Sequence, residues 1–348
     1  MRRATCLRWL LAVVLALAAG STAAQPRRPE VTAFYVPWEK SALASLKAHV
    51  GQIDVFSPTW GSLVSPTGKV VWEDDPEAHA ALAAATRRPR LLPLVSNAHD
   101  DIWDVAAAEA VILQRPAAQA FAQALMKQAK ADRLAGFVMD FENLTPKATA
   151  GYPAFLAHLK TALNAQHLEV WVTTTLSDED GLPRDLSKDV DAVVLMAYDQ
   201  CWATSTPGPI AADAWLAANL TAKLAGQDPR RFVVALASYG YDWPAGKRAK
   251  VTAVAPLAEL ASAAGAAVQH DPGSNPHFSY RARDRSQHQV WWVSGSDVAR
   301  QRAMIAPLGL RGVALWRMGL EDPDLWTARA AAPTLPRGPA ASCEPLPR

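Results

Sequence analysis

The most constraining feature of this chain is a regular alternation of short apolar runs with longer segments rich in Ala and Leu. Short apolar runs bounded by turn residues are typical of strands buried on both faces, and the longer segments are typical of helices. The predicted strands are residues 31–36, 53–57, 91–96, 136–141, 168–174, 191–198, 232–237 and 312–316, and predicted helices include 77–86, 116–131, 152–164 and 212–225. Eight strands with helical crossovers predict an α/β fold, a (β/α)8 TIM barrel.

A doubly wound open sheet is the alternative fold. Such a sheet ordinarily has a Gly-rich phosphate-binding loop after its first strand, and residues 36–39 read Val-Pro-Trp-Glu instead. The connection between the seventh and eighth predicted strands, residues 243–300, is longer than the others. It holds two strand-like runs, 278–280 and 289–293, on either side of a polar turn at 283–286. We therefore expect a small inserted subdomain there.

The first 24 residues have the pattern of a secretory signal peptide, with three arginines, an apolar run and a cluster of small residues in order. We therefore expect an exported protein, either periplasmic or secreted. The barrel domain is then predicted at residues 25–330, and the Pro- and Ala-rich residues 331–348 are expected to form a flexible tail. No later segment is long and apolar enough to span a membrane, so we expect no membrane anchor.

The net charge of the chain indicates which classes of partner it can bind. There are 35 Lys and Arg residues against 33 Asp and Glu, and three of the arginines lie in the predicted signal peptide. The rest of the chain is therefore close to neutral and lacks clusters of basic residues. This argues against nucleic acid or an anionic membrane surface as the main partner. A neutral glycan is compatible with such a surface, and we expect a monomer.

Two carboxylates end the fourth predicted strand, in an otherwise apolar segment. Side chains alternate along a strand, so Val138, Asp140 and Glu142 share one face and Phe137 and Met139 lie on the other. Acids in such a place are costly unless they are paired or functional. A confined Glu close to a second acid has a raised pKa, as a glycosidase general acid requires. A structural ion-pair network with Arg or Lys is the alternative.

Several of the 13 Trp residues follow strand-like runs, among them Trp38, Trp60 and Trp316. The C-terminal ends of the strands are where a barrel displays its active site. Aromatic faces at these positions are suited to stacking on pyranose rings. For any single Trp, a place in the hydrophobic core is the alternative.

Three motifs occur here in the order found in glycoside hydrolase family 18, the chitinase-like barrels. They are Asp140-Phe141-Glu142, Met196-Ala197-Tyr198-Asp199 and Gly312-Val313-Ala314-Leu315-Trp316. Over about residues 30–327 the chain resembles this family, and especially bacterial chitinase-like domains found beside polysaccharide deacetylases or in cell-wall lysins. The family pattern D-G-x-D-x-D-x-E is incomplete, because Ala135 and Val138 stand where its first two acids would be.

The resemblance implies retaining, substrate-assisted hydrolysis of β-1,4 bonds in glycans that contain N-acetylglucosamine, such as chitin-like oligomers, peptidoglycan or an exopolysaccharide. Glu142 would protonate the glycosidic oxygen, Asp140 would orient the 2-acetamido group, and Tyr198 would hydrogen-bond the acetamido oxygen. The predicted substrate-binding residues are Asp199, Met196, Trp316, Trp38 and Trp60. No metal or organic cofactor is implied.

Structural roles for the predicted site residues, and a binding function without catalysis, are the alternatives at this point. Tyr198 can be a barrel-core tyrosine and Asp199 a turn cap. The loss of an acid at Val138 also leaves open a non-catalytic glycan-binding barrel, although such a protein has no need to keep a proton donor at Glu142. A digestion panel separates the enzyme from the binding protein.

Other hydrolytic chemistries fit the sequence poorly. The eight His residues show no metal-ligand spacing, and residues 236–240 lack the first Gly of a nucleophile elbow. The run His99-Asp100-Asp101 is expected to be a solvated loop. Cys201 and Cys343 are the two cysteines outside the predicted signal peptide. They can form a disulfide in an oxidising compartment, but their spacing gives no geometric evidence for one.

Overall fold

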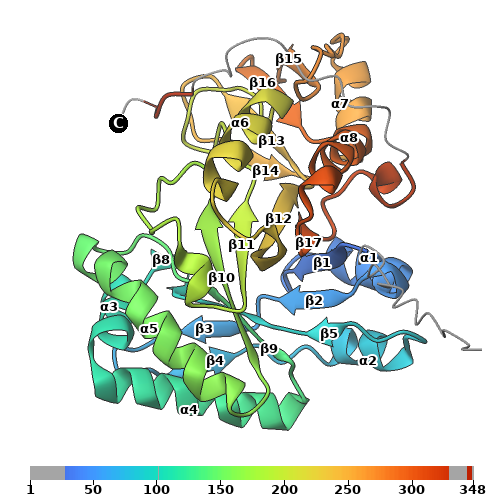
Figure 1. Ribbon diagram of the computed structural model, residues 1–348. Coiled ribbons are helices and arrows are strands. Elements are labelled where there is room, and N and C mark those ends of the chain that lie inside the picture. Colours follow the sequence, from blue (N-terminus) through green and yellow to red (C-terminus); the bar gives the residue numbers. More distant parts are fainter. Residues whose placement is uncertain (1–27, 101, 329–342, 347–348) are drawn as a thin grey trace, which may run out of the picture.

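The computed structural model describes residues 28–100, 102–328 and 343–346, and its main sheet forms a barrel of parallel strands (Figure 1). The barrel strands are β1 (Glu30–Tyr35), β2 (Val55–Pro58), β5 (Arg90–Leu91), β6 (Leu94–Ser96), β9 (Gly136–Asp140), β10 (Glu169–Thr175), β11 (Ala192–Met196), β12 (Phe232–Ala237) and β17 (Gly312–Trp316). They correspond to the eight predicted strands, and the predicted barrel is confirmed.

The third barrel position is shared by β5 and β6, which are separated by Pro93. Proline has no backbone N–H, so it interrupts the ladder. β5 pairs with β2 on one side, and β6 pairs with β9 on the other. The chain segment that holds these two short strands therefore joins β2 on one side of the barrel to β9 on the other.

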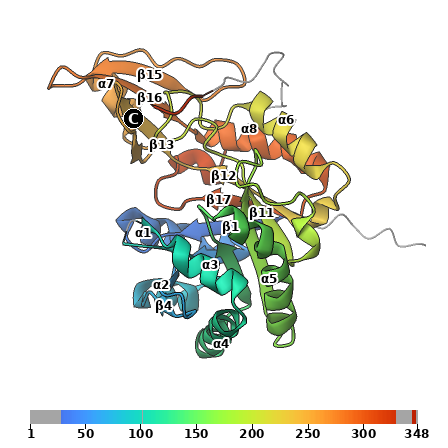
Figure 2. The ribbon, with the colours of Figure 1, turned by 90° about the vertical axis from the view of Figure 1, so that its left-hand side faces the viewer.

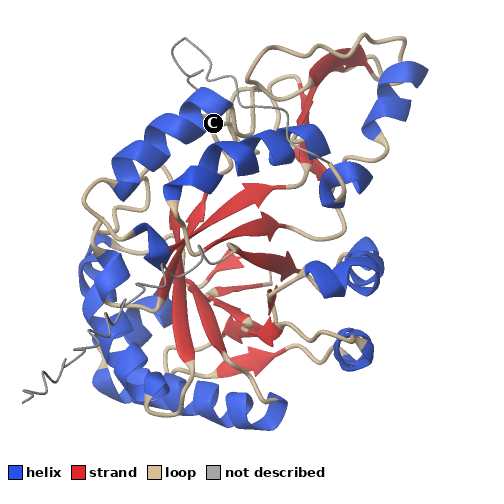
Figure 3. Ribbon diagram, turned by 45° about the vertical axis from the view of Figure 1, so that its right-hand side comes forward, coloured by secondary structure: helices blue, strands red, loops and turns tan. Residues whose placement is uncertain are grey.

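Helices surround the strands (Figure 3). They are α1 (Lys40–His49), α2 (Pro76–Ala84), α3 (Val105–Leu113), α4 (Arg115–Asp132), α5 (Pro146–Asn164), α6 (Asp213–Leu224) and α8 (Gly295–Ile305). Side chains that accept a hydrogen bond from the first turn set where four of them begin, at Asp75, Asp104, Thr145 and Ser294. The described connection after β10 has only a short 3-10 turn at Leu186–Lys188 in place of a helix.

Strand β9 separates two hydrophobic cores, as its alternating pattern predicts. Phe137 and Met139 belong to the layer between the sheet and the outer helices. Val138 belongs instead to the interior of the barrel, where it packs in one cluster with Phe34 and Trp171. The carboxylates that follow Val138 on the same face are thereby directed along the barrel interior toward its mouth.

An antiparallel sheet lies between β12 and β17 and stands out from the barrel (Figures 2 and 3). Its strands, in the order β14-β13-β16-β15, are β13 (Gly240–Pro244), β14 (Lys250–Thr252), β15 (His277–Arg281) and β16 (Gln287–Trp292), and α7 (Leu257–Ala263) covers it. The pairing of β15 with β16 confirms the predicted hairpin. The sheet begins at Gly240 rather than at residue 243, because β13 pairs with β16 from Gly240 onward.

Two short hairpins were not predicted from the sequence. One is formed by β3 (Gly61–Leu63) and β4 (Val70–Trp72), and the other by β7 (Ala98–His99) and β8 (Ile102–Trp103). Strands of two or three residues are too short to show a period in the sequence. The second hairpin includes His99 from the expected solvated loop, while Asp101 lies outside the described residues.

The chain termini are only partly described. The predicted signal peptide, residues 1–24, and most of the predicted tail lie outside the described residues. Residues 343–346 do not behave as the expected flexible tail, because Cys343 forms a disulfide with Cys201 and Pro345 forms a bridge with Ser205. No helix in the described part of the chain is long and apolar enough to cross a bilayer.

Candidate active site

A cleft with a volume of about 690 Å³ lies at the C-terminal ends of the barrel strands. Six of the predicted site residues line it, and they come from three strand ends: Asp140, Glu142, Met196, Tyr198, Asp199 and Trp316. The barrel thus brings together three motifs that are far apart in the sequence. This is the end of a (β/α)8 barrel at which active sites are built.

Asp140 is the last residue of β9 and is 7% exposed. At the start of the strand, a Cβ on Gly136 would lie 2.2 Å from the Glu169 carbonyl oxygen, so only glycine permits this close approach to β10. The carboxylate accepts a hydrogen bond of 2.6 Å from the Thr173 hydroxyl. Burial raises the pKa of Asp140, and the bond from Thr173 acts in the opposite direction.

Glu142 lies two residues beyond, and the buried side chain of Asn97 holds its backbone. The Glu142 N–H donates to Asn97 Oδ1 at 2.9 Å, and Asn97 Nδ2 donates to the Glu142 carbonyl at 3.1 Å. Burial raises the pKa of Glu142, and the nearby carboxylates of Asp140 and Asp199 raise it further. Both effects favour the protonated form of Glu142.

The structure does not show the alternative of a structural ion-pair network at Asp140 and Glu142. Burial and other carboxylates govern Asp140 and Glu142, and no Arg or Lys acts on either of them among the described residues. Uncompensated buried acids of this kind cost stability and mark candidate functional sites. The described residues also include no group of three or more His, Cys, Asp or Glu side chains that could hold a metal ion.

Tyr198 follows β11 and faces the cleft. Its ring stacks on Trp316 with centroids 6.3 Å apart and contacts the edge of Tyr239 at 6.3 Å. Burial and the neighbouring acids Asp140 and Asp199 raise the pKa of its hydroxyl, which has no hydrogen-bond partner among the described residues. A satisfied core tyrosine would have such a partner. The hydroxyl is therefore available to a molecule in the cleft.

Asp199 has a left-handed backbone conformation with φ of 58°. Its carboxylate accepts hydrogen bonds from the hydroxyls of Tyr239 and Tyr241, the second at 3.1 Å. These partners lie at the start of the inserted sheet, so Asp199 links the barrel to that wall of the cleft rather than capping a local turn. Burial raises the pKa of Asp199 to about 6.

The three predicted Trp residues have different places in the structure. Trp316 ends β17, lines the cleft and packs edge to face on Phe34 with centroids 5.4 Å apart. Trp38 is 69% exposed but is not among the residues that line the cleft. Trp60 is 3% exposed and packs in the outer core with Phe56 and His79, so the structure does not bring it to the cleft.

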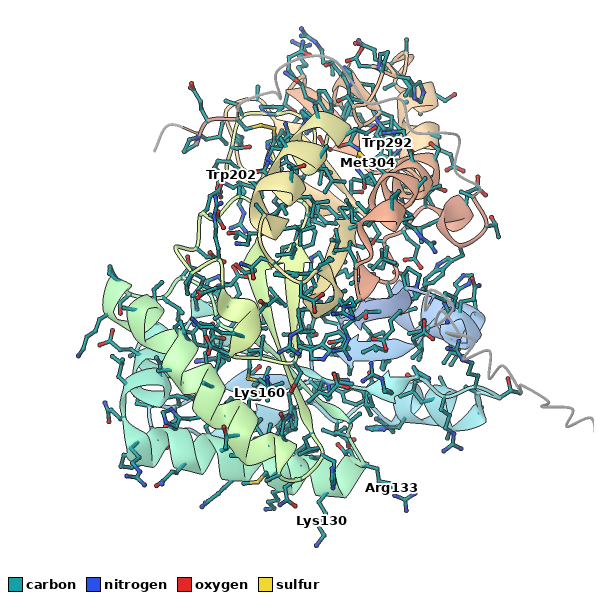
Figure 4. All side chains as sticks on the ribbon, viewed as in Figure 1. Lys130, Arg133, Lys160, Trp202, Trp292 and Met304 are labelled. Atoms are coloured by element: carbon teal, nitrogen blue, oxygen red, sulfur yellow. A yellow bond between two sulfur atoms is a disulfide. The ribbon has the colours of Figure 1, made fainter. Side chains whose placement is uncertain are left out.

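Sequence reasoning missed several residues of the cleft. Trp103 on β8, Trp202 and Arg248 also line it, and Asn97 supports it from below. A signal for Trp202 was present, because it follows the Tyr198-Asp199 motif closely at a strand end. Figure 4 shows Trp202 in the upper half of the view, far from Lys130 and Arg133 at the bottom.

A comparison of the sequence with known protein families identifies the family of this chain. The sequence model described as "Glycosyl hydrolases family 18" matches residues 64–321. The chain belongs to glycosyl hydrolase family 18. It is therefore a glycoside hydrolase, with the chitinase-like barrel expected from its motifs.

Relatives within family 18 agree with this assignment. The glycosylase YvbX of Bacillus subtilis is 25% identical over 261 residues, which are 70% of this chain and 75% of YvbX. The cortical fragment-lytic enzyme of Bacillus anthracis is 27% identical over 54% of this chain, and the match spans about half of that enzyme, 47%. The chitinase of Chromobacterium violaceum has the same fold, with a TM-score of 0.78 at 24% identity over 86% of this chain and 97% of that one.

The chain departs from the family 18 pattern at Val138, which is fully buried and packs in the apolar cluster of the barrel interior. The Thr173 hydroxyl donates a hydrogen bond to the Asp140 carboxylate. Asp140 is therefore held by a neutral donor that favours its charged form, without a second carboxyl below it.

Proposed function

We propose that this family 18 hydrolase cleaves β-1,4 bonds of glycans that contain N-acetylglucosamine, with retention and with help from the substrate's own 2-acetamido group. The observation that carries the proposal is the environment of Glu142. This acid lies in the cleft with a pKa raised by burial and by other carboxylates, and no basic residue acts on it. Such a group supplies a proton near neutral pH.

In the first step Glu142 donates its proton to the glycosidic oxygen while the bond from that oxygen to C1 breaks. The acetamido carbonyl oxygen of the same sugar attacks C1 and forms an oxazolinium ion. Asp140, whose carboxylate accepts a hydrogen bond from Thr173, accepts another from the acetamido N–H and in its ionised form balances the positive charge. The Tyr198 hydroxyl donates to the acetamido oxygen and aligns it for attack.

In the second step the Glu142 carboxylate takes a proton from water as that water attacks C1 and opens the oxazolinium ring. Two displacements at C1 restore the original configuration. Glu142 ends the cycle protonated, so no cofactor is consumed. Each proton that leaves the enzyme is thus regained from the water that enters the product.

The aromatic side chains of the cleft fit a chain of sugars. Trp316 lines the cleft with the two acids, and so do Trp103 on β8 and Trp202 in the connection after β11. Aromatic faces bury the apolar faces of pyranose rings, so three of them suit an oligosaccharide better than a single sugar. We propose a glycan of several residues as the substrate.

We also propose that the protein is exported and acts as a monomer. The signal-peptide pattern of the first 24 residues supports export. The Cys201–Cys343 disulfide is compatible with an oxidising compartment.

A digestion panel tests the proposal. Chitin oligomers, peptidoglycan and partly deacetylated poly-N-acetylglucosamine are incubated with the protein, and products are read by mass spectrometry and by NMR of the new anomeric proton. We expect β products first and no cleavage where glucosamine precedes the bond. Glu142→Gln should lower kcat by at least about a thousandfold, near the upper range for an acid/base group, while Glu77→Gln on α2 keeps full activity.

The same panel can show binding without cleavage. A protein that binds these glycans and releases no product, with affinity unchanged by Glu142→Gln, is a glycan-binding barrel. The replacement of a family acid by Val138 is the observation that favours this second possibility. Efficient cleavage next to glucosamine would instead exclude the acetamido group as the nucleophile.

A further inference from the structure

The segment between Tyr198 and α6 forms one wall of the cleft and includes Asp199 and Trp202. Cys201 precedes Trp202 in the sequence and is fully buried and bonded to Cys343. The two Cα atoms are 5.3 Å apart although 142 residues separate them in the sequence. The far end of the chain is thus tied to the middle of a cleft wall.

Besides the disulfide, the residues after Cys343 make backbone hydrogen bonds to the segment after Trp202. The Thr206 N–H donates to the Glu344 carbonyl at 2.7 Å, and the Leu346 N–H donates to the Thr204 carbonyl at 2.7 Å. Ser205 and Pro345 form the antiparallel bridge between these two bonds. Residues 343–346 therefore lie as a short extra strand along residues 204–206.

The residues that this strand touches also fix the backbone of Trp202. The fully buried Ser205 side chain accepts a hydrogen bond from the Trp202 N–H at 3.0 Å, and the Ser205 N–H donates to the Trp202 carbonyl at 2.9 Å. The turn from 202 to 205 is therefore held both by the hydrogen bonds of Ser205 and by the strand at 343–346.

Two more contacts pack the wall around the disulfide. A Cβ on Gly208 would lie 2.4 Å from Cys201 Sγ and 3.5 Å from Cys343 Sγ, so the chain passes directly over the sulfur atoms. The Ala249 N–H donates to the Ala203 carbonyl at 2.7 Å, which joins the turn to the inserted sheet next to Arg248. The disulfide thus lies at the centre of the contacts that place Trp202.

We propose that residues 343–346, bonded through Cys201–Cys343, are a positioning element that holds Trp202 in the cleft and so sets the affinity for glycans long enough to contact it. The inference rests on the proposed function, because it takes the cleft occupant to be a glycan. Without the bond, residues 201–206 gain conformational freedom, and binding must then restrict it again. Glu142 is held separately by β9 and Asn97, so the chemical step should be spared.

The test compares wild type with the double variant Cys201→Ser/Cys343→Ser, which leaves no free thiol from the pair. Trp202→Ala first identifies the chitin oligomers whose KM depends on Trp202. For those oligomers we expect the double variant to raise KM about tenfold, which is about 1.4 kcal/mol, with kcat within twofold. A short aryl glycoside that does not sense Trp202 should be cleaved as by wild type.

Two controls make the result specific to the disulfide. A reductant should reproduce the KM change on folded wild type and should have no effect on the double variant. Adding Trp202→Ala to the double variant should give no further loss, because both changes remove the same contact. Additive losses, or an equal loss on short and long substrates, would overturn the proposal.

A readout that needs no activity separates this proposal from the proposed function. Amide hydrogen exchange in residues 201–206 should rise at least tenfold on reduction of wild type, whereas exchange in residues 136–142 should stay unchanged. If exchange in 201–206 does not change, the positioning role is wrong, whatever the protein cleaves. If exchange rises but no glycan in the panel is cleaved or bound, the proposed function fails and the mechanical link stands.

Discussion

Tyr198 illustrates how a single residue in this site differs from an ordinary core aromatic. Its ring is packed between Trp316 and Tyr239, as in a core, but its hydroxyl has no partner among the described residues. The ring is only partly buried, and the residue lines the cleft. The molecule that restores the missing bond is, in our proposal, the acetamido group of the substrate.

Tyr198→Phe should therefore lower kcat more than it raises KM. The lost bond strengthens as charge develops on the acetamido oxygen, so the expected loss is roughly 2–4 kcal/mol, similar to one oxyanion-hole donor. Steady-state kinetics and thermal unfolding on the same preparation give both quantities. A variant that is destabilised but keeps full kcat would remove Tyr198 from the reaction.

Asp140 affects the proton on Glu142 as well as the substrate. In the proposed mechanism Glu142 acts in its protonated form, so kcat/KM should fall as the pH rises through its pKa. The charge on Asp140 raises that pKa. Asp140→Asn removes the charge, and the alkaline limb of the pH profile of its residual activity should therefore move to lower pH. An unchanged or higher limb would show that the proton donor is another group.

At the scale of elements, the connections after the strands hold the site together. Asn97 lies between β6 and β7 and makes two hydrogen bonds to the backbone of Glu142, beyond β9. The Tyr hydroxyls at the start of the inserted sheet bond to Asp199 after β11. These connections therefore hold the backbone of Glu142 and the carboxylate of Asp199 in place.

Asn97→Ala should reduce both stability and activity. The Glu142 N–H loses its partner in a buried site, which costs about 1–3 kcal/mol of unfolding free energy. We expect kcat to fall more than KM rises, because Glu142 is no longer held at the glycosidic oxygen. Urea unfolding and kinetics measure the two effects. Asn219→Ala, on the outer helix α6, is a matched control and should keep kcat.

The strand pattern was predictable at this scale, and the connections were only partly so. Runs such as 232–237 are apolar along their whole length because both of their faces are buried, and the structure has β12 at those residues. The hairpins β3–β4 and β7–β8 are two or three residues per strand and depend on pairing with neighbours. Local sequence cannot specify such pairing.

At the scale of the whole molecule, the site lowers the stability of the fold. Glu142 has a raised pKa in the folded chain, and it has its ordinary pKa when unfolded. A carboxyl whose pKa is raised by folding makes its full contribution to the stability of the folded protein at a pH below its unfolded pKa. That contribution is lost as the pH rises through its folded pKa. The folded protein therefore loses stability between acid and mildly alkaline pH on account of Glu142.

Glu142→Gln should consequently raise the melting temperature at pH 8, even though it abolishes turnover. At pH 4 the carboxyl is largely protonated in both states, so the difference from wild type should shrink toward zero. Calorimetry at the two pH values measures this. Glu77→Gln on the outside of α2 should show no such dependence, and a Glu142→Gln protein that is less stable at pH 8 would contradict the argument.

The sequence by itself determined the barrel, the inserted hairpin and the six residues that meet in the cleft. Each of these follows from a local pattern: buried strands, a polar turn between two runs, and motifs placed at strand ends. Residues Asp140 and Tyr198 meet because parallel strands end at one mouth, whatever the length of chain between them.

Only the tertiary structure decided which individual side chains complete the site. Trp60 and Trp202 both follow strand-like runs, yet one packs in the outer core and the other lines the cleft. Cys201 meets Cys343 across 142 residues, and the Asn97 side chain reaches the backbone of Glu142. The physical reason is that burial and pairing depend on which distant elements pack together, and no local pattern contains that information.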